Sequence, residues 1–439
     1  MSDMNEYARI KEIGKVITGK TPSTENEENF DGEFPFITPS DISTFDEKYI
    51  VETERTISSK GYKKMKNNLL PMNTICFVCI GSTIGKMCLT KKPSFTNQQI
   101  NALIVNENYD AQYVFYLLRY VKGYFQQIGA GTGSGKGIVN KSTFEKSRIC
   151  VEKKLLTQKE ISSILSAYDD LIENNNKRIK ILEQMAENLY KEWFVRFRFP
   201  GYENALVKDS LLGKIPQSFN VLKMKHIIDY YIGGGWGEDE QKQGFPCGAY
   251  VIRGTDFSNI KNGEWMQCPY RYHKKSNYMA RKLSPWDIII EISGGTQEQP
   301  VGRTLIVTPD LLEKLGDTVI CASFCKQVRC NNEIISPSYF YYWMQYLYQT
   351  RVIDKFQSQT TGIINFKFEY FLRKGDVLMP PKDLMDKFEK YIKTIYKMKD
   401  KLAIKNQNLI KQRDLLLPRL MSGKLEVGGE RKHHYKNCQ

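Results

Sequence analysis

The chain has 439 residues, and 64 lysines and arginines against 49 aspartates and glutamates give it a formal net charge of +15. This length predicts two or three domains, each able to bury a core, and the excess of positive charge favours a polyanionic partner. The first residues, MSDMNEYARIKEI, hold no apolar signal segment, and no apolar run approaches the roughly 18 residues of a membrane span. We therefore expect a cytoplasmic protein and exclude the secreted and membrane-spanning classes.

Several segments recur in the same order in the two halves of the chain. FPFITPSDIS (34–43) returns as AYVIRGTDFS (249–258), YVFYLLRY as YFYYWMQY, and GIVNKSTF as GIINFKFE. The repeat is far longer than the roughly 20–50 residues of solenoid units. It therefore indicates a duplicated module, an arrangement suited to a linear target that is read at two places.

Each copy predicts a mixed α/β (α+β) domain followed by a long helix. Short β-rich runs with glycine and proline punctuation precede one helix, around Tyr113–Gly123 in the first copy and around Tyr339–Arg351 in the second. The expected layout is a first domain at 1–153, a helix at 154–199, a second domain at 200–382, a helix at 383–425 and a C-terminal tail at 426–439.

The long helices carry the clearest pattern. From Ile161 to Trp193, and from Phe388 to Leu420, seam residues follow one another in alternating steps of four and three. This heptad spacing predicts a coiled-coil seam, and a symmetric arrangement pairs the two helices antiparallel. At 1.5 Å per residue, about 40 residues make a rod of roughly 60 Å.

Four seam positions are polar: Asn175, Lys399, Asn406 and Arg413. Polar seam residues commonly fix the register of a coiled coil. They would equally be tolerated where the two helices diverge and leave them exposed, so both interpretations stay open.

The glycine-rich segment from Gly129 to Gly137, GAGTGSGKG, resembles a phosphate-binding loop. Ala130 and Gly137 stand where that motif needs glycine and a hydroxyl residue, and the segment follows a helix. We interpret it as a flexible basic loop that is either disordered or able to bring backbone N–H groups and Lys136 to a DNA phosphate.

Two further glycine turns lie at matching places in the copies. IGSTIGKMCLT carries Ser82, Thr83 and Lys86, and EISGGTQEQPVGR carries Gln297, Gln299 and Arg303. They are either plain hairpin turns or DNA contacts, in which glycine lets the backbone approach and the polar side chains supply donors. The divergent side chains on a shared framework favour DNA contacts.

Other loops add candidates for the same role. Gln98 lies in the run Asn97–Gln99, whose counterpart is Ser323–Lys326, and both runs would also serve as turns. The early loops of the two copies hold Lys20 and Thr21 in one case and Trp236 between glycines in the other. Trp236 is either a wedge for DNA or a packing anchor.

Signatures of catalysis are absent from the sequence. Met379–Lys382 differs from the Asn/Asp-Pro-Pro-Tyr/Phe tetrapeptide of amino-methyltransferases at its first and last residues. Pro309-Asp310 is not followed by the Asp/Glu-x-Lys pattern at the spacing found in nucleases. Cys76 and Cys79 lie in a strand pattern that sends them to opposite faces, which favours buried thiols over a metal site. We expect no catalytic residue, cofactor or metal on this chain.

The chain resembles the DNA-specificity subunit of type I restriction-modification systems over nearly its whole length. The matching stretches are ITPSDIS, GSTIGKMCLT, TNQQINALIV, IENNNKRIKILEQMAENLYKEWFVRF, DIIIEISGGTQEQPVGR and NLIKQRDLLLPRLMSGKLEV. The segment GAGTGSGKG is richer in glycine than this loop usually is in the family.

The resemblance implies two target-recognition domains that each grip one half of an asymmetric bipartite site in double-stranded DNA, with the helices setting the gap. It also implies two methyltransferase subunits and motor-nuclease subunits as partners, and these would hold S-adenosylmethionine, ATP and Mg²⁺. Two rival hypotheses are a nucleotide-binding enzyme that uses the glycine-rich loop, and a coiled-coil scaffold with no role at DNA.

Overall fold

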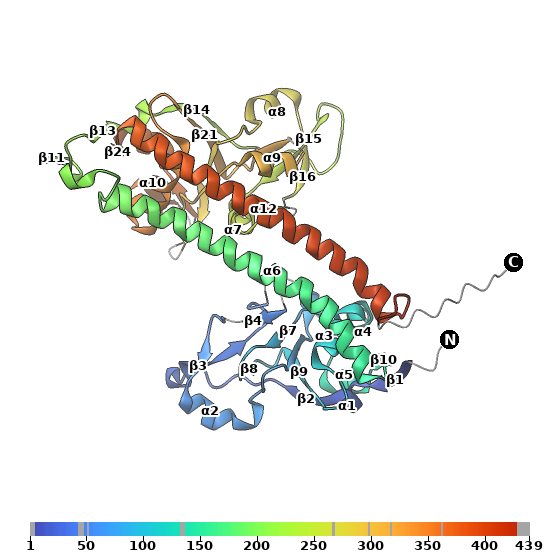
Figure 1. Cartoon of the computed structure of the whole chain (residues 1–439). Coiled ribbons are helices and arrows are strands. Elements are labelled where there is room, and N and C mark those ends of the chain that lie inside the picture. The colour runs from blue at the N-terminus through green and yellow to red at the C-terminus, as the bar shows by residue number, and fades with distance from the viewer. Residues whose placement is uncertain are drawn as a thin grey trace. The chain divides into compact units, whose positions relative to one another are not determined.

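The computed structural model of the chain (Figure 1) describes residues 5–42, 48–50, 52–131, 137–265, 268–296, 299–316, 318–360 and 363–427. It divides into two units, one formed by residues 1–173 with 407–439 and the other by residues 174–406. Each unit holds a domain of mixed α/β structure and a stretch of both long helices, so the expected fold class is confirmed.

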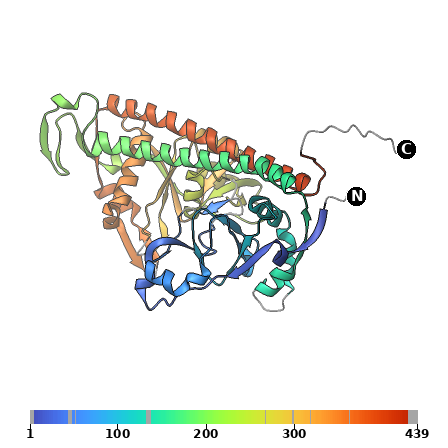
Figure 2. The same ribbon diagram turned by 60° about the horizontal axis from the view of Figure 1, so that its bottom comes forward.

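The first unit is built on a five-stranded sheet of order β2-β9-β6-β7-β4, next to a three-stranded sheet β5-β3-β8 and the pair β1-β10 (Figure 2). Its strands are β1 Asn5–Arg9, β2 Gly14–Thr18, β3 Phe30–Ile37, β4 Tyr49–Ile50, β5 Thr56–Ile57, β6 Ile75–Val78, β7 Met87–Thr90, β8 Phe95–Thr96, β9 Ile100–Val105 and β10 Arg148–Glu152. Its short helices are α1 Ile10–Ile13, α2 Ser59–Met65, α3 Ala111–Tyr120, α4 Lys122–Ala130 and α5 Lys141–Lys146.

The second unit has a four-stranded sheet of order β14-β21-β17-β19, two three-stranded sheets, β16-β15-β20 and β18-β23-β22, and the pairs β11-β12 and β13-β24. Its strands are β11 Val207–Ser210, β12 Gly213–Pro216, β13 Asn220–Lys223, β14 Ile228–Gly233, β15 Cys247–Ile252, β16 Tyr270–His273, β17 Ile288–Glu291, β18 Ser293–Gly295, β19 Thr304–Ile306, β20 Val319–Cys321, β21 Cys325–Cys330, β22 Gln357–Thr360, β23 Ile363–Phe366 and β24 Asp376–Met379. Its short helices are α7 Phe257–Lys261, α8 Lys275–Arg281, α9 Pro309–Lys314, α10 Pro337–Gln349 and α11 Phe368–Lys374.

The two domains repeat one topology. The antiparallel order β2-β9-β6-β7 of the first recurs as β14-β21-β17-β19 in the second, and the parallel pair β3-β8 recurs as β15-β20. The buried helices α3 and α10 also begin alike, with the Asp110 and Ser336 side chains accepting the backbone N–H three residues on. The duplication predicted from the sequence is confirmed, although the single helix expected around Tyr113–Gly123 is two, α3 and α4.

The long helices are α6, Leu155–Tyr190, and α12, Lys382–Met421. A π-helical turn, Lys191–Val195, ends α6 earlier than the expected residue 199, and Phe197 then takes a left-handed conformation (φ 57°) that an α-helix cannot continue. Among the described residues, no helix combines the length and apolarity needed to cross a membrane.

Both long helices bury the predicted seam. In the first unit, Ile161 and Leu165 of α6 share a core cluster with Leu417 and Leu420 of α12. In the second unit, the seam residues of α6 and α12 again lie in common clusters, for example Ile179 with Leu402. The expected antiparallel coiled-coil pairing is thereby confirmed within each unit.

Three polar layers cross the helix pair at intervals of seven residues. In the first unit, Arg413 Nη1 donates to Asp169 Oδ1 at 2.5 Å. In the second unit, Asn406 Nδ2 donates to Asn176 Oδ1 at 2.7 Å, and Lys399 pairs with Glu183.

The four polar seam residues, Asn175, Lys399, Asn406 and Arg413, are buried. The side chain of Arg413 is 1% exposed and that of Asp169 is 3% exposed. Asn175 Nδ2 also donates to Asn406 Oδ1 at 2.8 Å inside the seam. Since a buried charge is tolerated only with its partner, these layers favour one register, and the polar seam positions are not residues exposed at a divergence of the helices.

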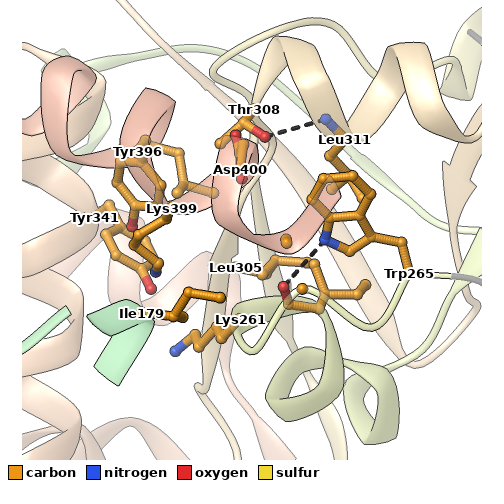
Figure 3. A pocket seen from close by; sticks show the side chains of 14 residues that line it. Ile179, Lys261, Trp265, Leu305, Thr308, Leu311, Tyr341, Tyr396, Lys399 and Asp400 are labelled. Atoms are coloured by element: carbon orange, nitrogen blue, oxygen red, sulfur yellow. Dashed lines mark hydrogen bonds between the residues drawn. The ribbon is translucent and has the colours of Figure 1, made fainter. Parts of the chain in front are cut away.

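A small cavity in the second unit adjoins the polar face of α12 (Figure 3). Asp400 and Lys399 reach it from α12, and Lys261, Tyr341 and Thr308 reach it from the domain. Burial raises the pKa of Asp400 to about 6, against the opposing effect of a hydrogen bond from Thr308.

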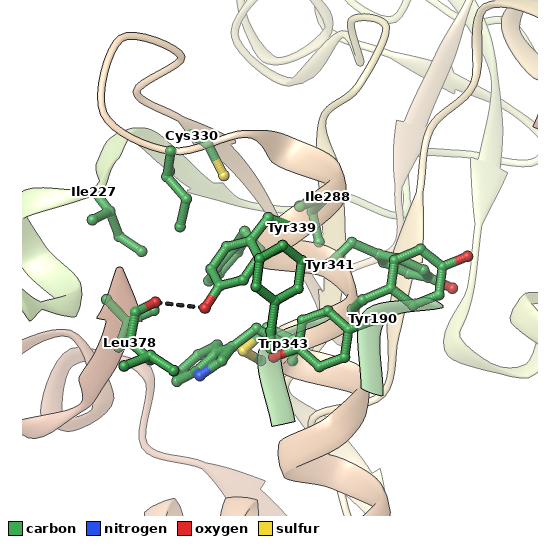
Figure 4. Packing of buried hydrophobic residues seen from close by; sticks show 14 of the residues in the cluster. Tyr190, Ile227, Ile288, Cys330, Tyr339, Tyr341, Trp343 and Leu378 are labelled. Atoms are coloured by element: carbon green, nitrogen blue, oxygen red, sulfur yellow. Dashed lines mark hydrogen bonds between the residues drawn. The ribbon is translucent and has the colours of Figure 1, made fainter. Parts of the chain in front are cut away.

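A cluster rich in aromatic residues forms one of the hydrophobic cores of the second unit (Figure 4). Tyr339 of α10 is fully buried, donates to the Leu378 carbonyl at 2.6 Å, and lies with its ring centroid 5.8 Å from that of Tyr190 on α6. The core therefore joins the domain to its own stretch of the long helices.

The Arg413 layer yields a stability prediction. Arg413→Met should leave the buried Asp169 carboxylate without its cation, and should lower the free energy of unfolding by about 3–5 kcal/mol in urea titrations at pH 8. Lys411→Met, an exposed position on the same helix, should change it by about 0.5 kcal/mol or less. Equal effects of the two substitutions would contradict the assigned role of the layer.

The Asp400 carboxyl yields a pH prediction. Its folded-state pKa of about 6 lies above the ordinary aspartate value, so ionisation favours the unfolded chain and stability should fall as pH rises from about 4 to 6. Asp400→Asn should remove this component, so that the variant gains stability relative to the wild type over that window. Thermal melts at several pH values measure it, with the exposed Asp209→Asn as the control that should show no comparable gain.

Candidate nucleic-acid interface

Five segments of the first domain meet at one rim, which we call the first rim: residues 18–23, 37–42, 78–86, 96–100 and 137–140. Backbone hydrogen bonds tie them together, for example from Gly19 N to Ile100 O at 3.1 Å and from Gly81 N to Gly137 O at 2.8 Å. Loops far apart in sequence therefore form one continuous edge.

Equivalent segments of the second domain form the second rim: residues 233–237, 252–256, 291–296 with 299–303, 321–326 and 363–367. The two rims are held by the same backbone hydrogen bonds. Six hydrogen bonds of the first rim each have an equivalent in the second. In the first rim they run from Gly19 N to Ile100 O, Lys20 N to Thr96 O, Asn97 N to Ile37 O, Cys79 N to Gln99 O, Val78 N to Lys86 O, and Val139 N to Cys79 O. In the same order, their equivalents in the second rim run from Gly234 N to Cys325 O, Gly235 N to Cys321 O, Ala322 N to Ile252 O, Ile292 N to Phe324 O, Glu291 N to Arg303 O, and Phe366 N to Ile292 O.

Glycines allow the same turn in both rims. Gly81 and Gly85 have φ of 68° and 90°, and their equivalents Gly294 and Gly302 have φ of 99° and 103°. Side chains rarely adopt these conformations, so the turns of the two copies share a requirement for glycine at the same places.

The frame aligns the two sets of side chains residue by residue. Equivalent positions hold different chemistry: Lys20 and Gly235, Thr21 and Trp236, Thr38 and Arg253, Lys86 and Arg303, Gln98 and Ser323, and Gln99 and Phe324. Two surfaces with one backbone geometry and different donors, acceptors and rings can distinguish different ligands of the same general shape.

The structure brings together the described candidates of the first domain. Thr21 Oγ1 donates to Gln98 Oε1 at 2.7 Å, which links two segments of the rim. Lys86 Nζ donates to the Ile42 carbonyl at 3.0 Å and links two others. Lys20 and Gln98 are exposed.

The turn from Ile80 to Lys86 presents the remaining two. Ser82 is exposed, whereas Thr83 is half-buried and donates its hydroxyl proton to the Ile80 carbonyl at 2.9 Å. Ser82 is therefore open to a ligand, and Thr83 also serves the turn itself.

In the second rim, two candidates are strongly engaged within the domain. Arg303 makes a bidentate pair with Glu291 at 2.6 and 2.8 Å, and this hydrogen-bonded pairing raises the pKa of the guanidinium. Lys326 Nζ lies 4.5 Å from the Phe368 ring centroid and 3.6 Å from Glu369. Both side chains stabilise the rim that carries them.

Trp236 and Gln299 are more open. Trp236 is 40% exposed, and its ring lies 4.6 Å from the Arg271 guanidinium carbon, which holds it in place. Gln299 is exposed in a turn closed by its backbone N–H to Thr296 Oγ1 at 3.0 Å. Lys136 and Gln297 lie outside the described residues.

Each rim also holds an aspartate that is not among the candidates predicted from the sequence. Asp41 accepts hydrogen bonds from the backbone N–H and hydroxyl of Thr38, and Asp256 accepts them from the backbone N–H and guanidinium of Arg253. The repeat of ITPSD as IRGTD was the available signal, because it places the same aspartate three residues after the presented side chain.

Within the described ranges, no group of three or more histidine, cysteine, aspartate or glutamate side chains is placed to hold a metal ion. Cys76 and Cys79 are both buried, and they lie in different core clusters on opposite faces of β6 and its extension. The predicted placement of these two thiols is confirmed.

Known proteins are similar to this chain in sequence. Residues 1–184 match the family described as the type I restriction modification DNA specificity domain. The chain is 26% identical over 438 residues to the type I restriction enzyme MjaIX specificity subunit of Methanocaldococcus jannaschii, covering 96% of this chain and 94% of the relative. It is 30% identical over 229 residues to the MjaVIII specificity subunit of that organism, covering 52% and 50%.

A solved structure shows the same fold. The type I restriction-modification S subunit from M. genitalium superposes with a TM-score of 0.54 at 14% identity, covering 96% of this chain and 97% of the other. The family match, the full-length relative and the duplicated topology agree, and the chain is similar over nearly its whole length to type I restriction-modification DNA-specificity subunits.

Proposed function

We propose that this chain is the DNA sequence-recognition subunit of a type I restriction-modification complex. Each rim contacts one half of an asymmetric bipartite site in double-stranded DNA, and the chain itself catalyses no reaction. The observation that carries the proposal is the pair of rims, which share their backbone hydrogen bonds and differ in their side chains.

Charge and side-chain type support DNA as the ligand. The net charge of +15 favours a polyanion, and Lys20 is exposed on the first rim. Amide, hydroxyl and guanidinium groups at Gln98, Ser82 and Arg253 are the donors and acceptors that read base edges and phosphates.

The paired helices are proposed to set the gap between the two half-sites. The polar layers favour one register of α6 on α12, so the length of the pair is defined by the sequence. A defined length is what a spacer between two binding surfaces requires.

The partners follow from the family. The relatives are named as specificity subunits of type I restriction enzymes, and we propose that this chain assembles with two methyltransferase subunits and with motor-nuclease subunits in the cytoplasm. S-adenosylmethionine, ATP and Mg²⁺ would then bind those partners, which would methylate adenine or cut DNA at the direction of this chain.

Phosphate contact by the first rim can be measured as a salt dependence. In the complex with methyltransferase subunits, Lys20→Ala should weaken binding to all DNA sequences alike and reduce the slope of log affinity against log salt by about 1. Lys15→Ala, an exposed lysine in β2 outside the rim, should leave the slope unchanged. A wild-type complex whose DNA affinity does not respond to salt would favour the scaffold hypothesis.

The spacer role can be tested by removing one heptad from each helix. Deleting residues 171–177 together with 406–412 removes the asparagine layer, and it leaves the Asp169–Arg413 and Glu183–Lys399 layers seven residues apart on both helices. The gap in the methylated motif should shorten by about 3 base pairs, since seven residues span about 10 Å.

Sequencing of methylated genomic DNA measures this gap. Deleting residues 171–177 alone is the matched control, because it destroys the register and should abolish methylation. Altered bases within either half-site, with the gap unchanged, would contradict the spacer role.

A further inference from the structure

Phe324 stands out in the second rim because its side chain is 64% exposed. It lies at the corner of a tight turn between β20 and β21, in which Cys325 N donates to Ala322 O at 2.8 Å. A largely exposed apolar side chain gains little free energy from burial, so packing alone does not account for a phenylalanine at this place in the rim.

The backbone of this turn is fixed from neighbouring segments. Ile292 N donates to the Phe324 carbonyl at 2.8 Å, Ala322 N donates to Ile252 O at 2.8 Å, and Gly234 N donates to Cys325 O at 2.9 Å. The ring is therefore presented by a preorganised support, which reduces the entropy lost when it contacts a ligand.

Cationic side chains lie on the segments around the turn. Arg253 is 40% exposed and is oriented by Asp256, and Arg281 Nε donates to the Gly233 carbonyl at 2.9 Å. Lys326 follows Phe324 by two residues along β21. A rim that presents an exposed apolar ring and also carries cationic side chains fits a ligand that combines a polyanionic backbone with aromatic or methyl-bearing groups, which is the chemistry of DNA.

The equivalent position in the first rim holds Gln99, whose neighbour Gln98 bonds Thr21. The first rim thus presents amides and hydroxyls where the second presents Phe324 and Trp236. Amides read base edges by hydrogen bonds, whereas an aromatic ring makes apolar contact with a thymine methyl group or inserts between base steps.

We propose that Phe324 is a specificity-determining residue of the second rim and makes apolar contact with the bases of one half-site. The inference rests on the proposed function. It adds that the second half-site is read in part by apolar contact and not by hydrogen bonds alone.

The test is to express the full complex with Phe324→Ala and map the methylated motif. One or two positions of a single half-site should become degenerate, and affinity for the wild-type site should fall on the order of tenfold with an unchanged salt slope, because no charge is removed. Phe324→Leu should retain part of the specificity. Tyr202→Ala, a 42% exposed aromatic outside the rim, should leave motif and affinity unchanged.

Modified DNA identifies the kind of contact. Replacing each thymine of that half-site by deoxyuridine removes only the methyl group, and 2-aminopurine reports unstacking. An effect of either modification in the wild type that disappears in Phe324→Ala supports the proposal.

Each failure has its own signature. If the wild-type complex methylates no bipartite motif, the proposed function itself is wrong. A wild-type motif that Phe324→Ala reproduces with equal affinity overturns the role of Phe324 alone. Loss of methyltransferase subunits from purified Phe324→Ala, with its thermal melt unchanged, would assign the ring to a protein contact and also overturn it.

Discussion

The structure depends on the polar layers between α6 and α12. Asp169, Asn176 and Glu183 recur every seventh residue on α6, and Arg413, Asn406 and Lys399 recur every seventh residue on α12. Asp169 and Glu183 lie on α6, and the cations that pair with them across the seam, Arg413 and Lys399, lie on α12. Pairing α6 with a second α6 would bury carboxylates together, so the layers favour pairing between unlike helices as well as one register.

Each domain contacts its stretch of the helix pair through an equivalent tyrosine, and the two tyrosines have partners of different chemistry. Tyr116 of α3 donates to Asp169, the acid of the Arg413 layer, and burial together with the Asp169 charge raises the pKa of that tyrosine. The second copy places Tyr342 of α10 with its hydroxyl 3.4 Å from that of Tyr396 on α12. The contact between domain and helix pair therefore lies at the same place in both copies. In the first copy the tyrosine belongs to an ion-paired network, and in the second it belongs to an aromatic core.

Sequence patterns were sufficient for the topology and insufficient for the pairing of side chains. The heptads located Arg413 and Lys399 in the seam, but Asp169 and Glu183 stand one residue beside it, where acids usually face solvent. Only the register across more than two hundred residues brings them together. The sequence predicts that Arg303 contacts DNA, and it does not predict the bidentate pair with Glu291. Glu291 is the last residue of a predicted strand, and the strand pattern does not show which residue lies opposite it. Sequence patterns do not single out Phe324, because an aromatic residue in a turn is exposed or buried according to loops that are distant in sequence.

Within each rim, backbone groups hold the loops together and side chains form the presented surface, so two copies of one module can come to present different surfaces. Backbone groups make the hydrogen bonds that join the loops, so most side chains at the rim can change without removing those bonds. The exceptions are the positions whose side chains complete the frame, such as Asp41 and Asp256, or glycines with left-handed backbone, such as Gly85 and Gly302. A substitution at Gln99 or Phe324 alters what the rim presents, whereas a substitution at Asp256 alters the rim itself. The side chains that each rim presents can therefore change at the first kind of position at little cost to folding, and under the proposed function this would allow the two rims to read unrelated sequences.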